Sequence, residues 1–329
     1  MRLLCLALLT LALAGCDGTV DDDFTPQLVV SAFLGTAEPL PDVRLSQTSP
    51  LLAVLDTAAL GVDGAEVSIT LLAPDGSDEE TYPYALAGPG RYSPVGADTV
   101  RELRTYRLDV TGPGGEQLTA QTTVPPDYDL VNPAPDDRDV GEVIYGLGLG
   151  PEVEITRSST DDRLAAFVGS VRALAPDDFE EVEIDGETRY RSLNLPDRFR
   201  PVSLFQRFLD CEEDDEGRLV CEEDPLQDFV VTGTSPVLNE ASYVTLPNGN
   251  ILVRVPFLAF GYLGPQDMTL VSLDPAFQAF LQTQAIQGGG STLSPGEIPN
   301  VTSNVEGGLG VFGSFSAETV QTTIVASPF

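Results

Sequence analysis

A strict alternation of apolar and polar side chains is the feature that most constrains the fold of this chain. The alternation is clearest in residues 67–71 and 106–110, where every second position carries Val, Ile, Leu or Tyr. A period of two places these side chains on one face of an extended strand, so both segments are predicted to be half-buried strands. Clusters of Gly and Pro, as in residues 74–76 and 112–115, are typical of turns. A mainly all-β fold is therefore expected.

Two domains follow from how these signals are distributed over the 329 residues. Residues 28–126 contain short strands between turns, as in an immunoglobulin-like β-sandwich of about 100 residues. Residues 127–140 are rich in Pro and Asp, which predicts a linker between domains. Residues 141–329 are again rich in strand signals, so we expect a second β-rich domain, either a sandwich or a barrel.

Hairpins and one or two short helices are predicted within the second domain. Asp-Gly at residues 185–186 and Asn-Gly at residues 248–249 lie between strand signals, and both dipeptides readily adopt the positive φ angles of tight turns. A helix is predicted over residues 275–286, because Asp274 can cap it. A shorter helix is predicted over residues 202–209.

The N-terminus has the pattern of an export signal. An apolar run over residues 3–14 follows one positive charge, and it is shorter than the roughly 20 residues that a membrane-spanning helix needs. The run Leu-Ala-Gly-Cys that ends at Cys16 resembles the lipobox of bacterial lipoproteins. We therefore expect removal of residues 1–15, acylation of Cys16, and a flexible acidic tether over residues 16–27. Ordinary secretion is the alternative, because residues 12–14 also form a small-x-small cleavage site.

The charge of the chain excludes one large class of partners. With 17 basic and 51 acidic residues the formal net charge is −34, and every basic residue is Arg. Nucleic acids require a basic surface, so nucleic-acid binding is excluded. An acidic chain without Lys is typical of a halophilic protein. Disorder is the competing explanation, but 42% of the residues are hydrophobic, which favours a folded protein.

Two of the four cysteines are expected to form a disulfide. Cys5 would leave with the signal peptide and Cys16 would carry lipid, which leaves Cys211 and Cys221. Disulfides persist in exported proteins, and Gly217 between these two cysteines could form the turn of a hairpin. We predict a bridge between Cys211 and Cys221, with two free thiols as the alternative.

The densest acidic cluster lies around these cysteines and suggests weak calcium binding. Glu212, Asp214, Glu216 and Glu223 occupy positions 1, 3, 5 and 12 of an EF-hand-like loop, with Gly217 at position 6. An EF-hand normally has Asp at position 1 and Asp or Asn at position 5, and a disulfide would impose a hairpin. A solvated acidic hairpin tip is therefore the alternative. No other cofactor is expected.

Missing residue types narrow the catalytic possibilities. The chain contains no His, so catalytic triads with a His base and the usual zinc sites are unavailable. A glycoside hydrolase needs only two carboxylates, but 51 acidic residues supply pairs by chance. We therefore expect a protein that is not an enzyme, with a carboxylate-based glycoside hydrolase as the third-ranked function and a calcium-stabilised surface or adhesion protein as the second.

A family resemblance rests on both ends of the chain. Residues 299–313 read PNVTSNVEGGLGVFG and resemble the closing signature of a Bacteroidota lipoprotein family, domain of unknown function 4249. N-terminal segments that share the resemblance are residues 28–30, 43–46, 64–67, 106–110 and 118–125. In physical terms the glycines of the signature can let a strand bulge or pack closely against another backbone, and ligand binding is the less favoured interpretation.

The resemblance carries expectations about location and partners. Members of this family resemble accessory lipoproteins of the outer membrane that occur beside TonB-dependent transporters, and this implies an accessory or binding role. Asp17 and residues 21–23 resemble the acidic stretch that directs such lipoproteins to the cell surface, with a periplasm-facing protein as the alternative. The triplets that begin at Asp56 and Asp98 resemble a short O-glycosylation signal, with Thr57 and Thr99 as acceptors.

Overall fold

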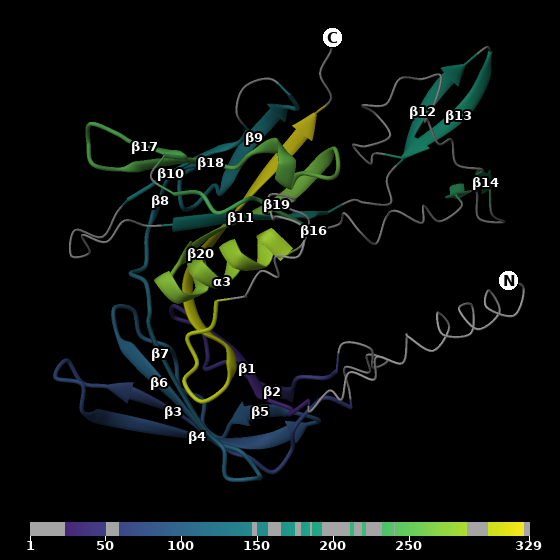
Figure 1. The fold of residues 1–329 in the computed structure, drawn as a ribbon. Coiled ribbons are helices and arrows are strands. Elements are labelled where there is room, and N and C mark those ends of the chain that lie inside the picture. The colour runs from purple at the N-terminus through teal and green to yellow at the C-terminus, as the bar shows by residue number, and fades with distance from the viewer. Residues whose placement is uncertain are drawn as a thin grey trace, which may run out of the picture.

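The structure is a computed structural model that describes most of the chain between residues 24 and 325. The described residues are 24–50, 59–146, 150–156, 166–174, 179–184, 186–192, 211–213, 219–221, 232–239, 241–287 and 302–325. Nearly all of the regular structure is β, which confirms the predicted fold class. Figure 1 shows two β units, one above the other, joined near the middle of the molecule. Within the described residues, no helix has the length and apolar character needed to cross a membrane.

Seven strands build most of the N-terminal unit. They are β1 (Leu28–Gly35), β2 (Val43–Gln47), β3 (Glu66–Leu72), β4 (Asp78–Gly88), β5 (Arg91–Pro94), β6 (Thr105–Thr111) and β7 (Gln117–Thr123). In β6 every second residue is buried, as its sequence period requires. One layer contains β3, β6 and β7, and the other contains β1, β2 and β5. The first half of β4 pairs with β3 and its second half with β5, so β4 connects the layers of the predicted β-sandwich.

The C-terminal unit contains the remaining elements. They are β8 (Leu130–Asn132), β9 (Asp139–Ile144), β10 (Glu152–Ile155), β11 (Ala166–Ala173), β12 (Phe179–Ile184), β13 (Glu187–Ser192), β14 (Cys211–Glu213), β15 (Leu219–Cys221), β16 (Thr232–Thr234), β17 (Tyr243–Thr245), β18 (Ile251–Arg254), η2 (Phe257–Ala259), β19 (Gly264–Leu273), α3 (Pro275–Gln287) and β20 (Leu309–Val325). A smaller sheet in the order β17-β18-β10-β8 packs against a larger one that contains β16, β11, β19, β20 and β9.

Both predicted hairpins and the longer predicted helix are present. β12 pairs with β13 around Gly186, and β17 pairs with β18 around Gly249. These two glycines have φ angles of 81° and 89°, which is the conformation that the dipeptides predicted. Helix α3 begins at Pro275, where the sequence placed it. The helix predicted over residues 202–209 lies outside the described residues.

The stretch predicted as a linker contributes to the C-terminal unit. Strand β8 and the start of β9 lie within residues 127–140. Tyr128 and Leu130 are buried in the core of this unit. The Tyr128 hydroxyl donates a hydrogen bond to the backbone oxygen of Leu270 and accepts one from the backbone N–H of Glu318, at 3.1 Å. These contacts tie the start of the stretch to β19 and β20.

Strand β20 joins the two units. Its first residues run parallel to β1, with Leu309 opposite Val29 and Phe315 opposite Gly35. Its later residues pair with β19 and β9 in the C-terminal unit. The strand therefore belongs to one continuous sheet that extends through both units, as Figure 1 shows for the yellow strand in the middle of the molecule.

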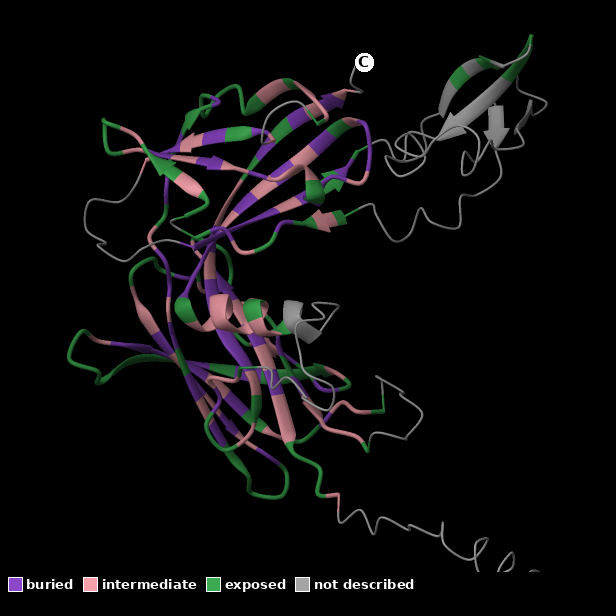
Figure 2. Ribbon diagram, turned by 45° about the horizontal axis from the view of Figure 1, so that its top comes forward, coloured by how far each residue is buried: buried purple, intermediate pink, exposed green. Residues whose placement is uncertain are grey.

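Each unit has its own hydrophobic core, and β20 contributes to both. Phe312 is fully buried in the N-terminal core, among residues of β1, β3 and β6. Val320 and Ile324 are buried in the C-terminal core, together with residues of β11, β18 and β19. Figure 2 shows the buried residues along the strands of both units. A single strand thus anchors its side chains in two cores.

Candidate functional site

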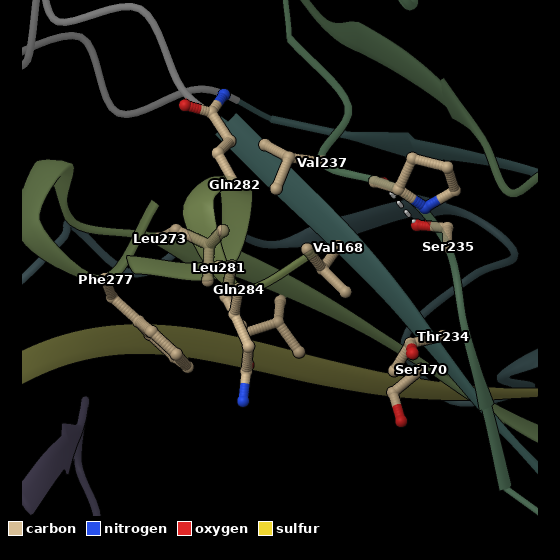
Figure 3. A pocket seen from close by; sticks show the side chains of 12 residues that line it. Val168, Ser170, Thr234, Ser235, Val237, Leu273, Phe277, Leu281, Gln282 and Gln284 are labelled. Carbon is tan, nitrogen blue, oxygen red and sulfur yellow. Dashed lines mark hydrogen bonds between the residues drawn. The ribbon is translucent and has the colours of Figure 1, made fainter. Parts of the chain in front are cut away.

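The candidate site is an apolar pocket on the outer face of the larger C-terminal sheet. One face of this sheet packs on the smaller sheet, through side chains such as Phe167 and Leu270. The opposite face carries Val168 and Val271, which are direct partners across the β11–β19 ladder. Alternation along each strand separates the two faces. Helix α3 covers part of this second face, and the pocket lies beside the helix (Figure 3).

The pocket has the size and lining of a small-molecule site. Its volume is about 630 Å³, within the usual range of about 300–1,000 Å³ for such sites. The lining comes from β11, β16, β19, α3 and the chain after β16. It consists of Val168, Ser170, Thr234, Ser235, Pro236, Val237, Val271, Leu273, Phe277, Leu281, Gln282 and Gln284. None of these twelve described residues carries a charge, although charged residues make up 21% of the chain.

An irregular edge strand forms one wall. β16 pairs with β11 from Arg172 to Ser170, and the ladder resumes where Leu238 pairs with Phe167. Between these points the Ser235 hydroxyl accepts the Gly169 N–H at 2.9 Å and lies 2.8 Å from the carbonyl oxygen of Pro236, to which it donates. The side chain of Ser235 therefore replaces part of the backbone ladder, and residues 235–237 bulge beside the pocket.

The polar groups of the lining lie at its margins. Ser170 and Thr234 are direct partners across the β11–β16 ladder, and Figure 3 shows them side by side at one end. Gln282 and Gln284 are exposed on α3. These hydroxyl and amide groups can donate and accept hydrogen bonds, but they do not exchange protons near neutral pH. These described lining residues therefore offer hydrogen bonds but no acid–base group.

Asp274 sets the position of α3. One carboxylate oxygen accepts the N–H groups of Ala276 at 2.7 Å and Phe277 at 3.3 Å, which is the N-cap arrangement that the sequence predicted. The other oxygen accepts the N–H of Ser314 in β20. The backbone N–H of Asp274 in turn donates to the Ser314 carbonyl oxygen at 3.0 Å. The start of the helix is therefore fixed to the strand shared by the two units.

A buried polar cluster surrounds this cap. Asp274 is only 3% exposed, and burial raises the pKa of its carboxyl group, although the N–H donors oppose the shift. The hydroxyls of Thr122 and Ser314 share a hydrogen bond of 2.7 Å, so β7 of the N-terminal unit reaches the same cluster. Phe33 of β1 packs against Phe277 of α3, with ring centroids 4.6 Å apart. Both units therefore support the helix that borders the pocket.

The C-terminal signature has a structural role in the described residues. The Asn304 side chain accepts the Phe312 N–H at 3.0 Å and donates to the carbonyl oxygens of Phe312 at 2.8 Å and Gln121 at 3.1 Å. Glu306 and Thr119 exchange backbone hydrogen bonds. The segment before β20 thus bridges β7 and β20 and covers the edge of the sandwich. This arrangement agrees with the favoured interpretation of close backbone packing.

Gly310 shows why the signature requires glycine. Its φ angle is 123°, and a Cβ atom at this position would lie 1.8 Å from the carbonyl oxygen of Val30. A side chain here would collide with the neighbouring strand, so only glycine lets β20 approach β1.

Most of the residues singled out in the sequence lie outside the described part. Cys16, Thr57, Asp214, Glu216 and Glu223 are among the undescribed residues. For Glu212 the structure describes only the backbone, in β14. In the described residues no three His, Cys, Asp or Glu side chains gather as metal ligands. The calcium site therefore stays a prediction.

The remaining two predictions have a described backbone setting. Cys211 and Cys221 are direct partners in the antiparallel β14–β15 pair, the hairpin that the disulfide prediction requires. Their side chains are not described, so the bridge stays a prediction. Thr99 is exposed in the connection after β5, where it forms an isolated β-bridge with Pro39. Its glycosylation also stays a prediction.

The pocket itself was missed from the sequence. The signal that could have found it is the apolar run Ala-Phe-Val-Gly-Ser-Val of β11, which departs from strict alternation. Such a run indicates a strand covered on both faces. In β11 the successive residues Phe167 and Val168 are both buried, one in the core and one in the pocket wall.

A strand shared by two β units and a pocket beside α3 whose twelve described lining residues are uncharged define a two-unit β-sandwich protein. The chain belongs to the family described as Domain of unknown function (DUF4249), whose model matches residues 17–321. This confirms the family that residues 299–313 suggested. No curated relative matches the chain.

Similarities to solved structures are weak. Trypsin-activated alpha-2-macroglobulin from Escherichia coli is 10% identical with a TM-score of 0.19, over 76% of this chain and 14% of that chain. The three N-terminal domains of the highly immunogenic outer capsid protein of bacteriophage RB49 are 8% identical with a TM-score of 0.18, over 92% of this chain and 71% of that chain. This chain therefore spans about one seventh of the macroglobulin, and these TM-scores are too low to relate the folds.

Proposed function

We propose that the chain is an exported lipoprotein, held on the outer membrane by lipid on Cys16, and that it is a non-enzymatic accessory or binding component of a TonB-dependent transport system. The observation that carries the binding role is the pocket beside α3. Its wall is mainly apolar, and none of its twelve described lining residues can transfer a proton at neutral pH. The family resemblance supports the transport context.

The N-terminal sequence supports the anchor. The lipobox that ends at Cys16 follows an apolar run of signal-peptide length. A single acyl chain holds a protein to a membrane only marginally, whereas two or more give stable attachment. Lipoproteins of this kind carry several acyl chains on the cysteine, so stable attachment is expected. The acidic residues that follow support an outward-facing location.

Labelling with a fatty-acid analogue tests the anchor. Cells that produce the wild-type protein should incorporate the label, and Cys16→Ser should abolish incorporation. Cys5→Ser is the matched control, because Cys5 lies in the segment that export removes, and it should leave the label unchanged. Equal labelling of the two variants would refute the anchor. Digestion of intact cells with a protease tests whether the protein faces outward.

Copurification tests the transport partnership. The protein is isolated from mildly solubilised membranes, and its companions are identified by mass spectrometry. We expect enrichment of a TonB-dependent transporter with the wild-type protein, and its loss with Cys16→Ser. Recovery of no transporter, under conditions that keep known outer-membrane complexes intact, would contradict the partnership.

A further inference from the structure

We propose that the pocket beside α3 binds an uncharged, mainly apolar small molecule that carries one hydrogen-bonding group such as a hydroxyl, carbonyl or amide. This inference rests on the proposed binding role and adds the chemical class of the ligand. It concerns the pocket alone and is independent of the membrane anchor and of the transporter.

Apolar side chains on the two main walls of the pocket indicate that the body of the ligand is apolar. Val168 and Val271 form the floor on the sheet, and Phe277 and Leu281 line the pocket from α3. Figure 3 shows Val168 on the sheet and Leu281 on the helix. Val271, Phe277 and Leu281 are only partly buried, so a ligand can still cover apolar area on them. Binding gains free energy in proportion to the apolar area removed from water. A volume of about 630 Å³ accommodates a molecule with several rings or a folded aliphatic chain.

The uncharged lining residues and the negative net charge of the chain both indicate that the ligand is uncharged. A charged group that enters an apolar pocket loses its hydration and needs an opposite charge there. The twelve lining residues offer none. Anions are disfavoured further, because a net charge of −34 repels them. Cations are attracted to the surface, but the twelve described lining residues include no carboxylate that could hold them.

Two hydroxyl groups at one end of the pocket indicate where the polar group of the ligand binds. Ser170 and Thr234 lie opposite each other on β11 and β16, and both are lining residues. Their hydroxyls can donate to and accept from a neutral polar group. Ser235 is less suited, because its hydroxyl already bonds to the backbone at Gly169 and Pro236. A ligand with its polar group at this end places its apolar body between the sheet and α3.

Two fluorescent probes that differ by one charge test the inference. N-phenyl-1-naphthylamine is uncharged, and 8-anilinonaphthalene-1-sulfonate has the same aromatic body with a sulfonate group. Both are titrated into the mature chain, residues 16–329 with Cys16→Ser, which needs no detergent. We expect saturable binding of the uncharged probe and at least about tenfold weaker binding of the sulfonate, which corresponds to about 1.4 kcal/mol.

Paired variants assign the binding to the pocket. Val271→Trp places a large ring in the floor and should abolish saturable binding. Asp267→Trp is the matched control, because Asp267 is four residues away on the same face of β19, pairs with Arg172 and is not a lining residue, so binding should be retained. Leu281→Asn keeps the side-chain size but adds polarity on α3, and should weaken binding even if Val271→Trp fails to fold.

The outcomes separate the ligand class from the binding role. Equal or tighter binding of the sulfonate, lost in Val271→Trp, would overturn the uncharged ligand and leave a binding pocket. If the wild type and all variants bind the uncharged probe with equal affinity, the probe does not bind in the pocket beside α3. Saturable binding of neither probe would overturn both the ligand class and the pocket as a binding site, whereas the anchor and transporter are judged by labelling and copurification.

Discussion

The carboxylate of Asp274 accepts the backbone N–H of Ser314, 40 residues further along the chain. The same carboxylate caps α3, so one side chain fixes the helix to the strand that both units share. The contact matters for the pocket, because Leu273 precedes the cap and Phe277 follows it in the pocket wall.

Removal of the Asp274 carboxylate should destabilise the protein. Asp274→Ala leaves the N–H groups of Ala276 and Ser314 without their acceptor in a buried setting, so the free energy of unfolding should fall by about 1–3 kcal/mol. Urea unfolding monitored by circular dichroism measures the change. Asp267→Ala on β19 is the control: Asp267 is a partly exposed acceptor for Gln321, and its loss should cost less than about 0.5 kcal/mol. Equal losses in the two variants would contradict the role of Asp274.

The stability difference between wild type and Asp274→Asn should depend on pH. Burial raises the pKa of Asp274 above its ordinary value of 3.8, so the folded protein binds this proton more tightly than the unfolded chain does. The resulting stabilisation is present below pH 3.8 and is lost as the pH rises through the raised pKa. Asn does not titrate, so the stability of the wild type relative to the variant should decrease over this window. An increase would contradict the raised pKa.

Asn304 should contribute to stability by closing the edge of the sandwich. Asn304→Ala removes three hydrogen bonds to the backbone of Phe312 and Gln121, and we expect a loss of about 1–3 kcal/mol in the free energy of unfolding. Thr302→Ala, in the same segment with an exposed side chain, should change stability little. If Asn304→Ala is as stable as the wild type, the signature serves another purpose.

Substitution of Gly310 should be far more damaging than substitution of Gly88. A Cβ atom at Gly310 would collide with the Val30 carbonyl oxygen, whereas at Gly88 it would meet only the Arg91 side chain at 3.7 Å. We expect Gly310→Ala to lose more than about 3 kcal/mol or to fail to fold, because the strained backbone and the collision act together. Gly88→Ala should stay within about 1 kcal/mol of the wild type. Thermal unfolding compares the two, and similar midpoints would contradict the close approach of β20 and β1.

Salt should stabilise this protein. The ion pairs of Arg107 with Asp78 and Asp109 are partly exposed and would weaken at high ionic strength. A net charge of −34 imposes a repulsion over the whole chain, however, and screening relieves it. Because the repulsion involves many more charges, we expect the melting temperature to rise between 0.1 and about 2 M NaCl. A fall would show that ion pairs dominate and would argue against a halophilic protein.

Local elements of the fold were predictable because their signals lie within a few residues. Alternation located β3 and β6, the dipeptide at residues 248–249 located a hairpin, and Asp274 located the start of α3. The parallel pairing of β20 with β1 was not predictable, because Leu309 and Val29 are 280 residues apart in the sequence and no local pattern links them. The pocket depends on another distant pairing, that of Val168 with Val271, and on the Ser235 bulge. The apolar run of β11 indicates that both faces of this strand are covered, but it does not indicate that α3 and the bulge at Ser235 cover the outer face.

Photo-crosslinking in living cells tests the transporter partnership most directly. A photoreactive residue replaces Leu258, which is 79% exposed on the C-terminal unit, or Val95, which is 67% exposed on the N-terminal unit. We expect light to link at least one of the two positions to a TonB-dependent transporter, and the same variant with Cys16→Ser to lose the link. Crosslinks from neither position, or crosslinks that persist without the lipid, would contradict an anchored accessory component of transport.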